Sequence, residues 1–136
     1  MRFLLDTNVL SETLKPLPNP RIVRQLALHD GHAAMASISW HELRFGAERM
    51  PAGKRRDAFR EAIARLRVHY PVFDYDADCA DWHAHERARL ERKGIHAEFA
   101  DGQIAAIAAM RKITLVTANV RDFRHYAGLT LIDWSR

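Results

Sequence analysis

A short apolar segment that ends in a carboxylate opens the chain, and it limits the possible folds more than any other feature. Residues 3–5 are all apolar and are followed directly by Asp6, Thr7 and Asn8. A run this short and wholly apolar favours a parallel strand covered on both faces, while Asp, Thr and Asn are residues that begin helices. Ligands of open α/β sheets bind at the carboxyl ends of the strands. We therefore expect Asp6 at this edge, either as a functional carboxylate or as the cap of a helix that starts near Val9.

The composition indicates one domain and places few limits on function. The 136 residues, 48% of them hydrophobic, are enough for a single domain over residues 1–136 with its own core. Lys and Arg exceed Asp and Glu by four, which suits a polyanionic partner such as nucleic acid but is common in proteins without one. The single Cys79 has no partner for an internal disulfide, and no segment has the pattern of a signal peptide or a membrane span. We expect a cytoplasmic protein.

Apolar strand patterns alternate with helical patterns along the whole chain. Further strands are predicted at 33–38, 71–75, 113–116 and 129–132, and helices at 9–15, 20–29, 39–50, 54–70, 77–93 and 100–110. Strands that alternate with helices build parallel sheets whose two faces are both covered. The chain is therefore predicted to have an α/β fold, with three α/β/α layers and a mostly parallel central sheet.

The predicted helix at 54–70 is strongly basic. Phe59, Ile63 and Leu66 recur at helical spacing and form an apolar face. The basic side chains lie mostly on the other faces: Lys54, Arg55, Arg56, Arg60, Arg65 and Arg67. A solvated helix face is the more common explanation of such a pattern, and a surface that contacts RNA is the functional one.

Four acidic residues share one position relative to the predicted elements. Asp6, Glu42, Asp101 and Asp122 each follow the carboxyl end of an apolar strand or lie at the head of a helix packed on one. Each also has a structural explanation. Asp6 could cap a helix, and Glu42 could be the fourth residue of a Ser-x-x-Glu capping box. Asp101 could complement a helix dipole, and Asp122 could stabilise a turn. A parallel sheet would nevertheless bring these edges together and place several carboxylates in one cleft.

A cluster of carboxylates requires a cation, because like charges repel and burial disfavours the ionised form. Oxygen ligands select Mg²⁺ or Mn²⁺ over Zn²⁺. The chain has one Cys, and His83 and His85 are two residues apart, so they point in different directions on a helix and form no common zinc pattern. Polar residues flank the same edges and either orient the acids or cap helices: Thr7, Asn8, Ser39, Thr117 and Asn119.

The four segments that contain these acids resemble the PIN domain. They are Leu-Leu-Asp-Thr-Asn-Val-Leu-Ser-Glu at 4–12, Glu-Leu-Arg-Phe-Gly at 42–46, Asp-Gly-Gln-Ile-Ala-Ala at 101–106 and Thr-Ala-Asn-Val-Arg-Asp-Phe at 117–123. Each segment alone is weakly specific, but the four occur in the family's order and cover essentially the whole chain. Within the PIN domains, the chain most resembles the VapC toxin branch, including its FitB-like members.

The resemblance implies a metal-dependent ribonuclease that is the toxin of a type II toxin–antitoxin pair. Such proteins are commonly homodimers and are inhibited by a VapB-type antitoxin. The implied reaction is hydrolysis of an RNA phosphodiester by a metal-activated water, which leaves a 5′-phosphate and a 3′-hydroxyl. The alternative is a PIN domain that binds RNA or a partner without cleaving it.

The resemblance also assigns roles to individual residues. Asp6, Glu42 and Asp101 match the family's first three metal-binding acids, with Mg²⁺ or Mn²⁺ as the cofactor. Family members place either the Asn or the Asp of the last segment in the fourth position, and we favour Asp122, with Asn119 as a polar partner. Arg44 and the basic helix at 54–67 would hold the RNA backbone.

Overall fold

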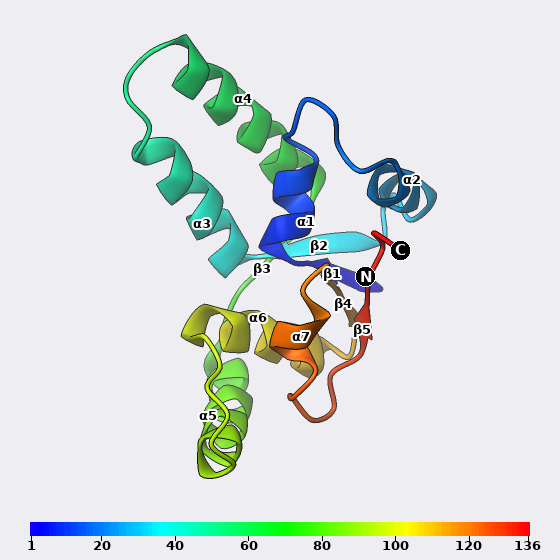
Figure 1. Ribbon diagram of the computed structural model, residues 1–136, viewed down its shortest axis with the longest axis vertical. Helices are drawn as coiled ribbons and strands as arrows, with labels where there is room; N and C mark the ends of the chain where they lie inside the picture. Colours follow the sequence, from blue (N-terminus) through cyan, green and yellow to red (C-terminus); the bar gives the residue numbers. More distant parts are fainter.

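Five parallel strands form one sheet in the computed structural model, which describes residues 1–136 (Figure 1). The order is β3-β2-β1-β4-β5, so the first strand of the chain is the central one. Every neighbouring pair of strands is parallel, which confirms the predicted sheet. The strands are short: β1 Phe3–Leu5, β2 Ala33–Ala36, β3 Val72–Phe73, β4 Thr114–Val116 and β5 Leu131–Ile132.

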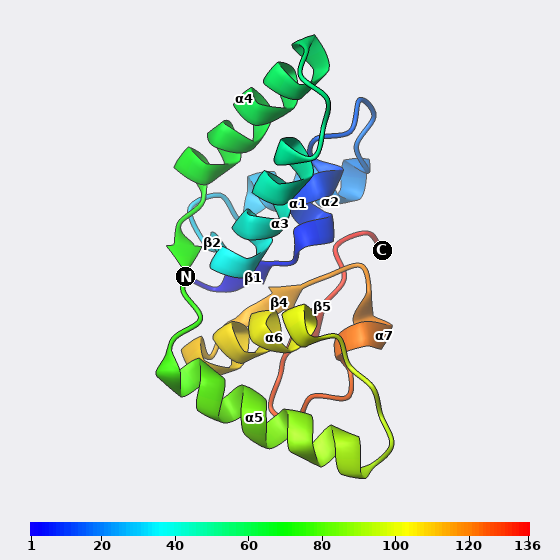
Figure 2. The same ribbon diagram turned by 90° about the vertical axis from the view of Figure 1, so that its left-hand side faces the viewer.

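Seven helices cover the two faces of the sheet and confirm the three predicted layers. They are α1 Thr7–Glu12, α2 Pro20–Leu28, α3 Ser37–Glu48, α4 Lys54–His69, α5 Ala77–Arg92, α6 Phe99–Arg111 and α7 Val120–Phe123. Figures 1 and 2 show α1 to α4 on one side of the sheet and α5 to α7 on the other. Two separate apolar cores lie under these layers, one with side chains of α1 to α4 and one with side chains of α5 to α7.

The alternation of side chains along β1 explains why its sequence is wholly apolar. Phe3 and Leu5 belong to the core under α1 to α4, whereas Leu4 belongs to the core under α5 to α7. Successive side chains of a strand point to opposite faces, so a central strand with helices on both sides has no solvated face. Leu5 lies opposite Met35 of β2 and Val116 of β4. The residues that follow these three positions therefore emerge together at one edge of the sheet.

Two helices begin earlier than the sequence predicts. Helix α1 starts at Thr7 rather than near Val9, because the Asp6 carboxylate caps it. Helix α3 starts at Ser37, so β2 ends at Ala36, two residues before the end of the strand predicted at 33–38. The capping-box explanation of Glu42 is therefore wrong: Ser39 lies inside the helix, and the capping position at Ala36 has no side-chain hydrogen bond. No helix has the length and apolar character needed to cross a membrane.

Candidate active site

Asp6 lies where β1 ends and α1 begins, and it is almost fully buried, with 5% of its surface exposed. Its Oδ1 accepts a hydrogen bond of 2.8 Å from the backbone N–H of Thr7, and its Oδ2 accepts one of 2.8 Å from the hydroxyl of Thr117. Thr117 directly follows β4, so the two central strands hold this carboxylate between them. Asp6 thus caps a helix and also presents a fixed carboxylate at the edge of the sheet, and its two predicted roles are compatible.

Thr7 connects the segment of Asp6 to the segment of Glu42. Its hydroxyl lies 2.8 Å from the hydroxyl oxygen of Ser39 and 3.4 Å from Oε1 of Glu42. Ser39 is fully buried between the two helices, one turn before Glu42 on α3. These contacts fix the distance between α1 and α3, and they hold Glu42 beside Asp6.

Asp101 lies in the first turn of α6, where its charge also complements the helix dipole. Burial has the largest effect on its pKa, and the negative charges of Asp6, Asp122 and Glu42 add to it. Together they raise the pKa of Asp101 to about 6. Asp122 lies in the first turn of α7, and its side chain is exposed. Because the charges of Asp6, Glu42 and Asp122 all act on the pKa of Asp101, the four predicted acids lie near one another at this edge of the sheet.

The pKa values of Asp6 and Glu42 are also raised. Burial raises the pKa of Asp6, and so does the charge of Asp122, while the hydrogen bonds from Thr117 and Thr7 act against this rise. Burial and the charge of Asp6 raise the pKa of Glu42. Ionisation of the cluster is therefore unfavourable until a cation lies among these oxygens.

A polar hollow of about 390 Å³ opens at this edge. No hydrophobic residue lines it, and its walls are Asp6, Thr7, Asn8, Ser11, Lys15, Glu42, Asp101 and Asn119. Asp122 is not among these residues. It lines a neighbouring hollow, and Asn119 lines both. Asn119 therefore lines the hollow itself, while the charge of Asp122 raises the pKa of Asp6 and of Asp101. Which of the two takes the fourth position stays a prediction.

Comparison with known proteins shows which family has this fold and sequence. The PIN domain model matches residues 3–129. The chain is 36% identical to the tRNA(fMet)-specific endonuclease VapC of Salmonella typhimurium over 98% of both chains, and 33% identical to toxin FitB of Neisseria gonorrhoeae over 88% of this chain and 89% of FitB. The crystal structure of DNA-bound VapBC from Salmonella typhimurium superimposes with a TM-score of 0.90 at 31% identity, over 98% of both chains.

The chain belongs to the VapC family of PIN-domain toxins. It is a ribonuclease toxin of a type II toxin–antitoxin pair, which confirms the resemblance seen in the sequence. The VapC fold also explains why the acids are dispersed in sequence: Asp6 follows β1, Glu42 lies within α3, and Asp101 and Asp122 lie in the first turns of α6 and α7.

The donor groups of this VapC chain fit Mg²⁺ or Mn²⁺. All polar atoms that the acids contribute to the hollow are oxygens, and Oδ1 of Asn8 is buried there without a hydrogen-bond partner. The structure brings together no group of three or more His, Cys, Asp or Glu side chains that could hold an ion. Mg²⁺ does not need such a group, because it is commonly bound by one or two carboxylates and keeps several waters.

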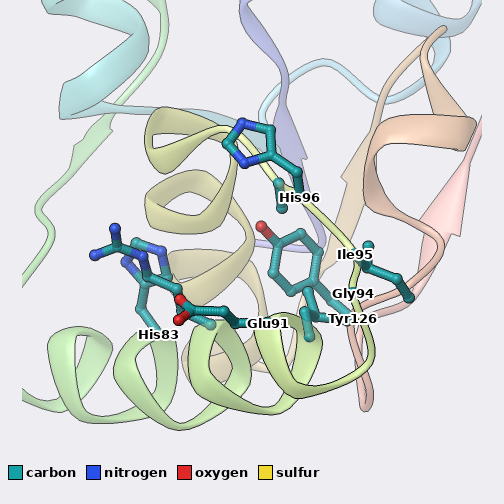
Figure 3. A pocket seen from close by; sticks show the side chains of 9 residues that line it. His83, Glu91, Gly94, Ile95, His96 and Tyr126 are labelled. Carbon is teal, nitrogen blue, oxygen red and sulfur yellow. The ribbon is translucent and has the colours of Figure 1, made fainter.

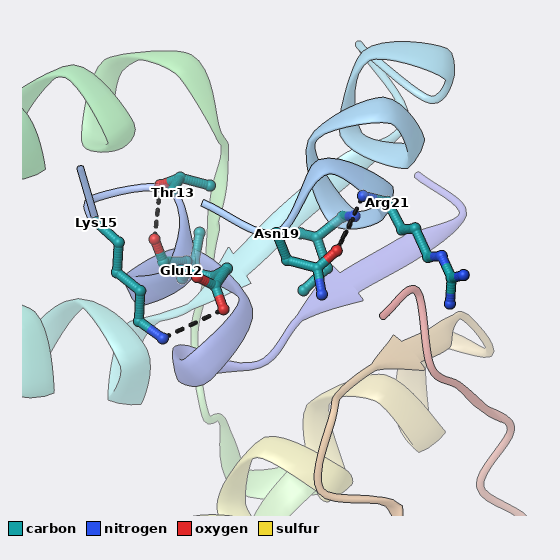
Figure 4. A network of polar contacts seen from close by, with 7 residues as sticks. Glu12, Thr13, Lys15, Asn19 and Arg21 are labelled. Carbon is teal, nitrogen blue, oxygen red and sulfur yellow. Dashed lines mark hydrogen bonds and ion pairs between the residues drawn. The ribbon is translucent and has the colours of Figure 1, made fainter. Parts of the chain in front are cut away.

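Lys15 and Ser11 line the hollow, but the sequence did not indicate them. The Nζ of Lys15 lies 3.3 Å from Oε1 of Glu12 (Figure 4), and Lys15 is the one cationic residue among the lining residues. Thr7, Ser11 and Lys15 follow one another at intervals of four residues, which is the spacing of one helix face. This spacing could have identified them once Thr7 was placed at the site.

Arg44, the predicted RNA contact, does not line the hollow. It is exposed on α3, and its guanidinium lies 3.0 Å from Oε1 of Glu48. The same carboxylate oxygen lies 3.0 Å from the guanidinium of Arg60 on α4. Arg44 therefore belongs to an ion-pair group between α3 and α4, and contact with RNA stays a prediction.

Proposed function

We propose that this VapC chain cleaves RNA with the help of Mg²⁺ or Mn²⁺ held at the carboxylate cluster. The observation that carries the proposal is the polar hollow whose walls include Asp6, Glu42 and Asp101 and no hydrophobic residue. Burial and the charges of Asp6, Asp122 and Glu42 raise the pKa of Asp101 there to about 6. A cluster arranged in this way favours a divalent cation over four free carboxylates. A PIN domain that only binds RNA would not need these acids to face one another.

Asp6 and Asp101 are the proposed direct ligands, and Glu42 would act directly or through a water. The hydroxyl of Thr117 and the N–H of Thr7 orient Asp6, while Thr7 and Ser39 orient Glu42. Asn8 and Asn119 would complete the oxygen-rich wall, with Asp122 adding negative charge behind it. When bound, the cation supplies activation of water and neutralisation of charge on a phosphodiester.

Lys15 is the proposed contact for an RNA phosphate next to the scissile one. A hollow walled by carboxylates repels a polyanion, and an ammonium group at its rim offsets this repulsion. The Lys15 side chain is largely exposed and is held only by its ion pair with Glu12, so it is free to exchange that carboxylate for a phosphate. The products would be a 5′-phosphate and a 3′-hydroxyl.

Transfer RNA is the proposed substrate class, because a relative of 36% identity is named as an endonuclease specific for tRNA(fMet). A VapB-type antitoxin is the proposed inhibitor, since the similar Salmonella toxin was solved as a VapBC assembly. We also propose that the chain forms a homodimer.

The test uses purified protein that has been freed of antitoxin. Labelled tRNA should be cleaved in the presence of Mg²⁺ or Mn²⁺, and EDTA should stop the reaction. Asp6→Ala and Asp101→Ala should lose activity while their circular dichroism spectra remain those of the wild type. Asp78→Ala is the matched control, because Asp78 also lies in the first turn of a helix but is exposed on α5, away from the hollow. Undiminished cleavage by folded Asp6→Ala protein would falsify the mechanism.

A further inference from the structure

His83 is a buried polar side chain that the proposed chemistry does not use. It lies on α5 with 3% of its surface exposed and faces α6. Its Nδ1 forms a hydrogen bond of 3.0 Å with the hydroxyl of Tyr75. The centroid of the Phe99 ring lies 4.8 Å from the centroid of the imidazole. Burial and the charge of Arg87 lower its pKa, so the imidazole is uncharged at neutral pH. A neutral ring is suited to packing directly against a helix backbone.

The imidazole leaves no room for a side chain at Gly102. A Cβ atom added there would lie 2.1 Å from Nε2 of His83 and 2.6 Å from its Cδ2. Both distances are far shorter than a van der Waals contact. The requirement at Gly102 is thus steric, because this glycine lies inside α6 and its backbone is helical. The tip of the His83 ring therefore rests on the backbone of the first turn of α6.

The ring is not enclosed on every side. A hollow of about 310 Å³ lies next to it, between α5, the 94–97 loop and Tyr126 (Figure 3). Packing alone would allow the imidazole to swing toward this space. The hydrogen bond between Tyr75 and Nδ1 therefore holds the ring against Gly102.

Gly102 directly follows Asp101, so the contact with His83 acts on the residue that carries the proposed metal ligand. We propose that Tyr75 and His83 form a positioning unit that fixes the first turn of α6 relative to α5 and thereby places the Asp101 carboxylate near Asp6, Glu42 and Asp122. This proposal rests on the proposed function. His83 touches neither RNA nor a metal ion in this role and acts through the backbone at Gly102.

The first test adds the missing methyl group. Gly102→Ala should lower kcat on tRNA by roughly 10- to 100-fold, with little change in KM, because loss of support for a metal ligand typically has an effect of this size. Binding of Mn²⁺ alone, measured by calorimetry, should weaken to a similar degree. Gly46→Ala is the matched control, since Gly46 also lies inside a helix that carries a site acid, and a Cβ atom there meets nothing within 4 Å. It should keep wild-type kcat and Mn²⁺ affinity.

The decisive test removes the imidazole in both backgrounds. His83→Ala should lower kcat in the wild-type chain, where α6 loses its support. In Gly102→Ala protein the same change should raise kcat and Mn²⁺ affinity, because it makes room for the new methyl group. Both quantities are measured per folded molecule, so that the reversal reports on the position of α6 and not on the amount of folded protein. If the two losses simply add, or if folded Gly102→Ala protein behaves like the wild type, the positioning role is refuted.

Tyr75→Phe provides an independent test if Gly102→Ala protein does not fold. It removes the one hydrogen bond on Nδ1 and adds no atoms, so kcat and Mn²⁺ affinity should fall while the melting temperature changes little. Wild-type values for both quantities in that variant would overturn the proposal. Failure of the proposed function looks different, because the wild-type protein itself would then neither cleave tRNA nor bind Mn²⁺.

Discussion

Two buried carboxylates of this protein lie in opposite electrostatic environments. Glu86 on α5 is 3% exposed and Asp6 is 5% exposed. Glu86 accepts hydrogen bonds of 2.8 and 2.9 Å from the guanidinium of Arg89 and one of 2.6 Å from the N–H of Ala127, and these contacts lower its pKa. The hydrogen bonds to Asp6 come from neutral donors, and burial and the charge of Asp122 raise its pKa.

We interpret the difference as one between a structural carboxylate and a proposed functional one. Arg89 also donates a hydrogen bond of 2.7 Å to the carbonyl oxygen of His125, so Glu86 and Arg89 together attach the loop after α7 to α5. The charge of Glu86 is satisfied inside the chain. The charges at the carboxyl edge of the sheet are not, and they are available to something that binds from outside.

The largest expected effect is on catalysis. Asp101→Asn keeps the size of the side chain but removes a charge that a cation needs, so kcat should fall by at least ~100-fold, as for loss of other groups that stabilise transition-state charge. The free energy of unfolding without divalent ions should not decrease, because the repulsion from Asp6 and Asp122 is relieved. Cleavage assays and urea denaturation measure the two quantities. A variant that is both inactive and clearly destabilised would place Asp101 in the structural class with Glu86.

Glu86→Gln should show the reverse. Loss of the charged hydrogen bonds to Arg89 and Ala127 should reduce the free energy of unfolding by about 2 kcal/mol, the usual size of a hydrogen bond to a charged group. Activity per folded molecule should stay near that of the wild type, since Glu86 does not line the active-site hollow. Loss of kcat at full folding would remove the distinction between the two carboxylates.

The stability of the metal-free protein should depend on pH in the direction set by Asp101. Its pKa is about 6 in the folded chain and 3.8 in the unfolded chain, so the folded state holds the proton more tightly. The resulting stabilisation is complete below pH 3.8 and is lost as the pH rises through about 6, a change of up to about 2 kcal/mol. Denaturation with EDTA from below pH 3.8 to about 7.5 would measure it, because the folded and unfolded chains differ in proton binding over this range. Excess Mn²⁺ should abolish this loss of stability at higher pH. A loss of the same size in the presence of Mn²⁺ would contradict a metal site.

The smallest expected effect concerns the rim of the hollow. Lys15→Met should raise KM for tRNA by roughly 5- to 10-fold with kcat little changed, and it should reduce the salt dependence of binding by about one charge. Arg44→Met is the comparison variant, because Arg44 is also a cation on this side of the sheet but is tied to Glu48 outside the hollow. Its KM should change by less than about 2-fold, in line with the small energy of exposed ion pairs. Equal effects in the two variants would show that only the general positive charge of the surface matters.

The sequence was sufficient for the fold because the elements depend on local patterns. The wholly apolar β1 predicted a strand buried on both faces, and the caps and breakers marked most helices, as at Asn19 before α2. The start of α3 was misjudged because Ser37 and Ile38 extend the apolar pattern of β2, while the backbone already turns at Ala36 without a side-chain cap. Local propensity does not resolve such a transition.

The candidate site was predictable in its acids and less so in its other walls. Asp6, Glu42, Asp101 and Asp122 stand out because each is polar at the end of an apolar segment. Whether Asn119 or Asp122 faces the hollow depends on the orientation of the four-residue helix α7, which no periodicity reveals. Lys15 follows the end of α1 and reaches the site only through the turn at 13–15. The contact of His83 with Gly102 joins two helices and leaves no signal in either one.

The hydrogen bond from Thr117 to Asp6 joins positions 111 residues apart. During synthesis, the first strand leaves the ribosome long before its neighbour β4 exists, and Asp101 and Asp122 also arrive late. If these acids form the active site as proposed, a growing chain lacks the complete site until Asp101 and Asp122 have been added. Because β1 pairs with the later β4, the proposed nuclease site would stay incomplete until both segments have been synthesised.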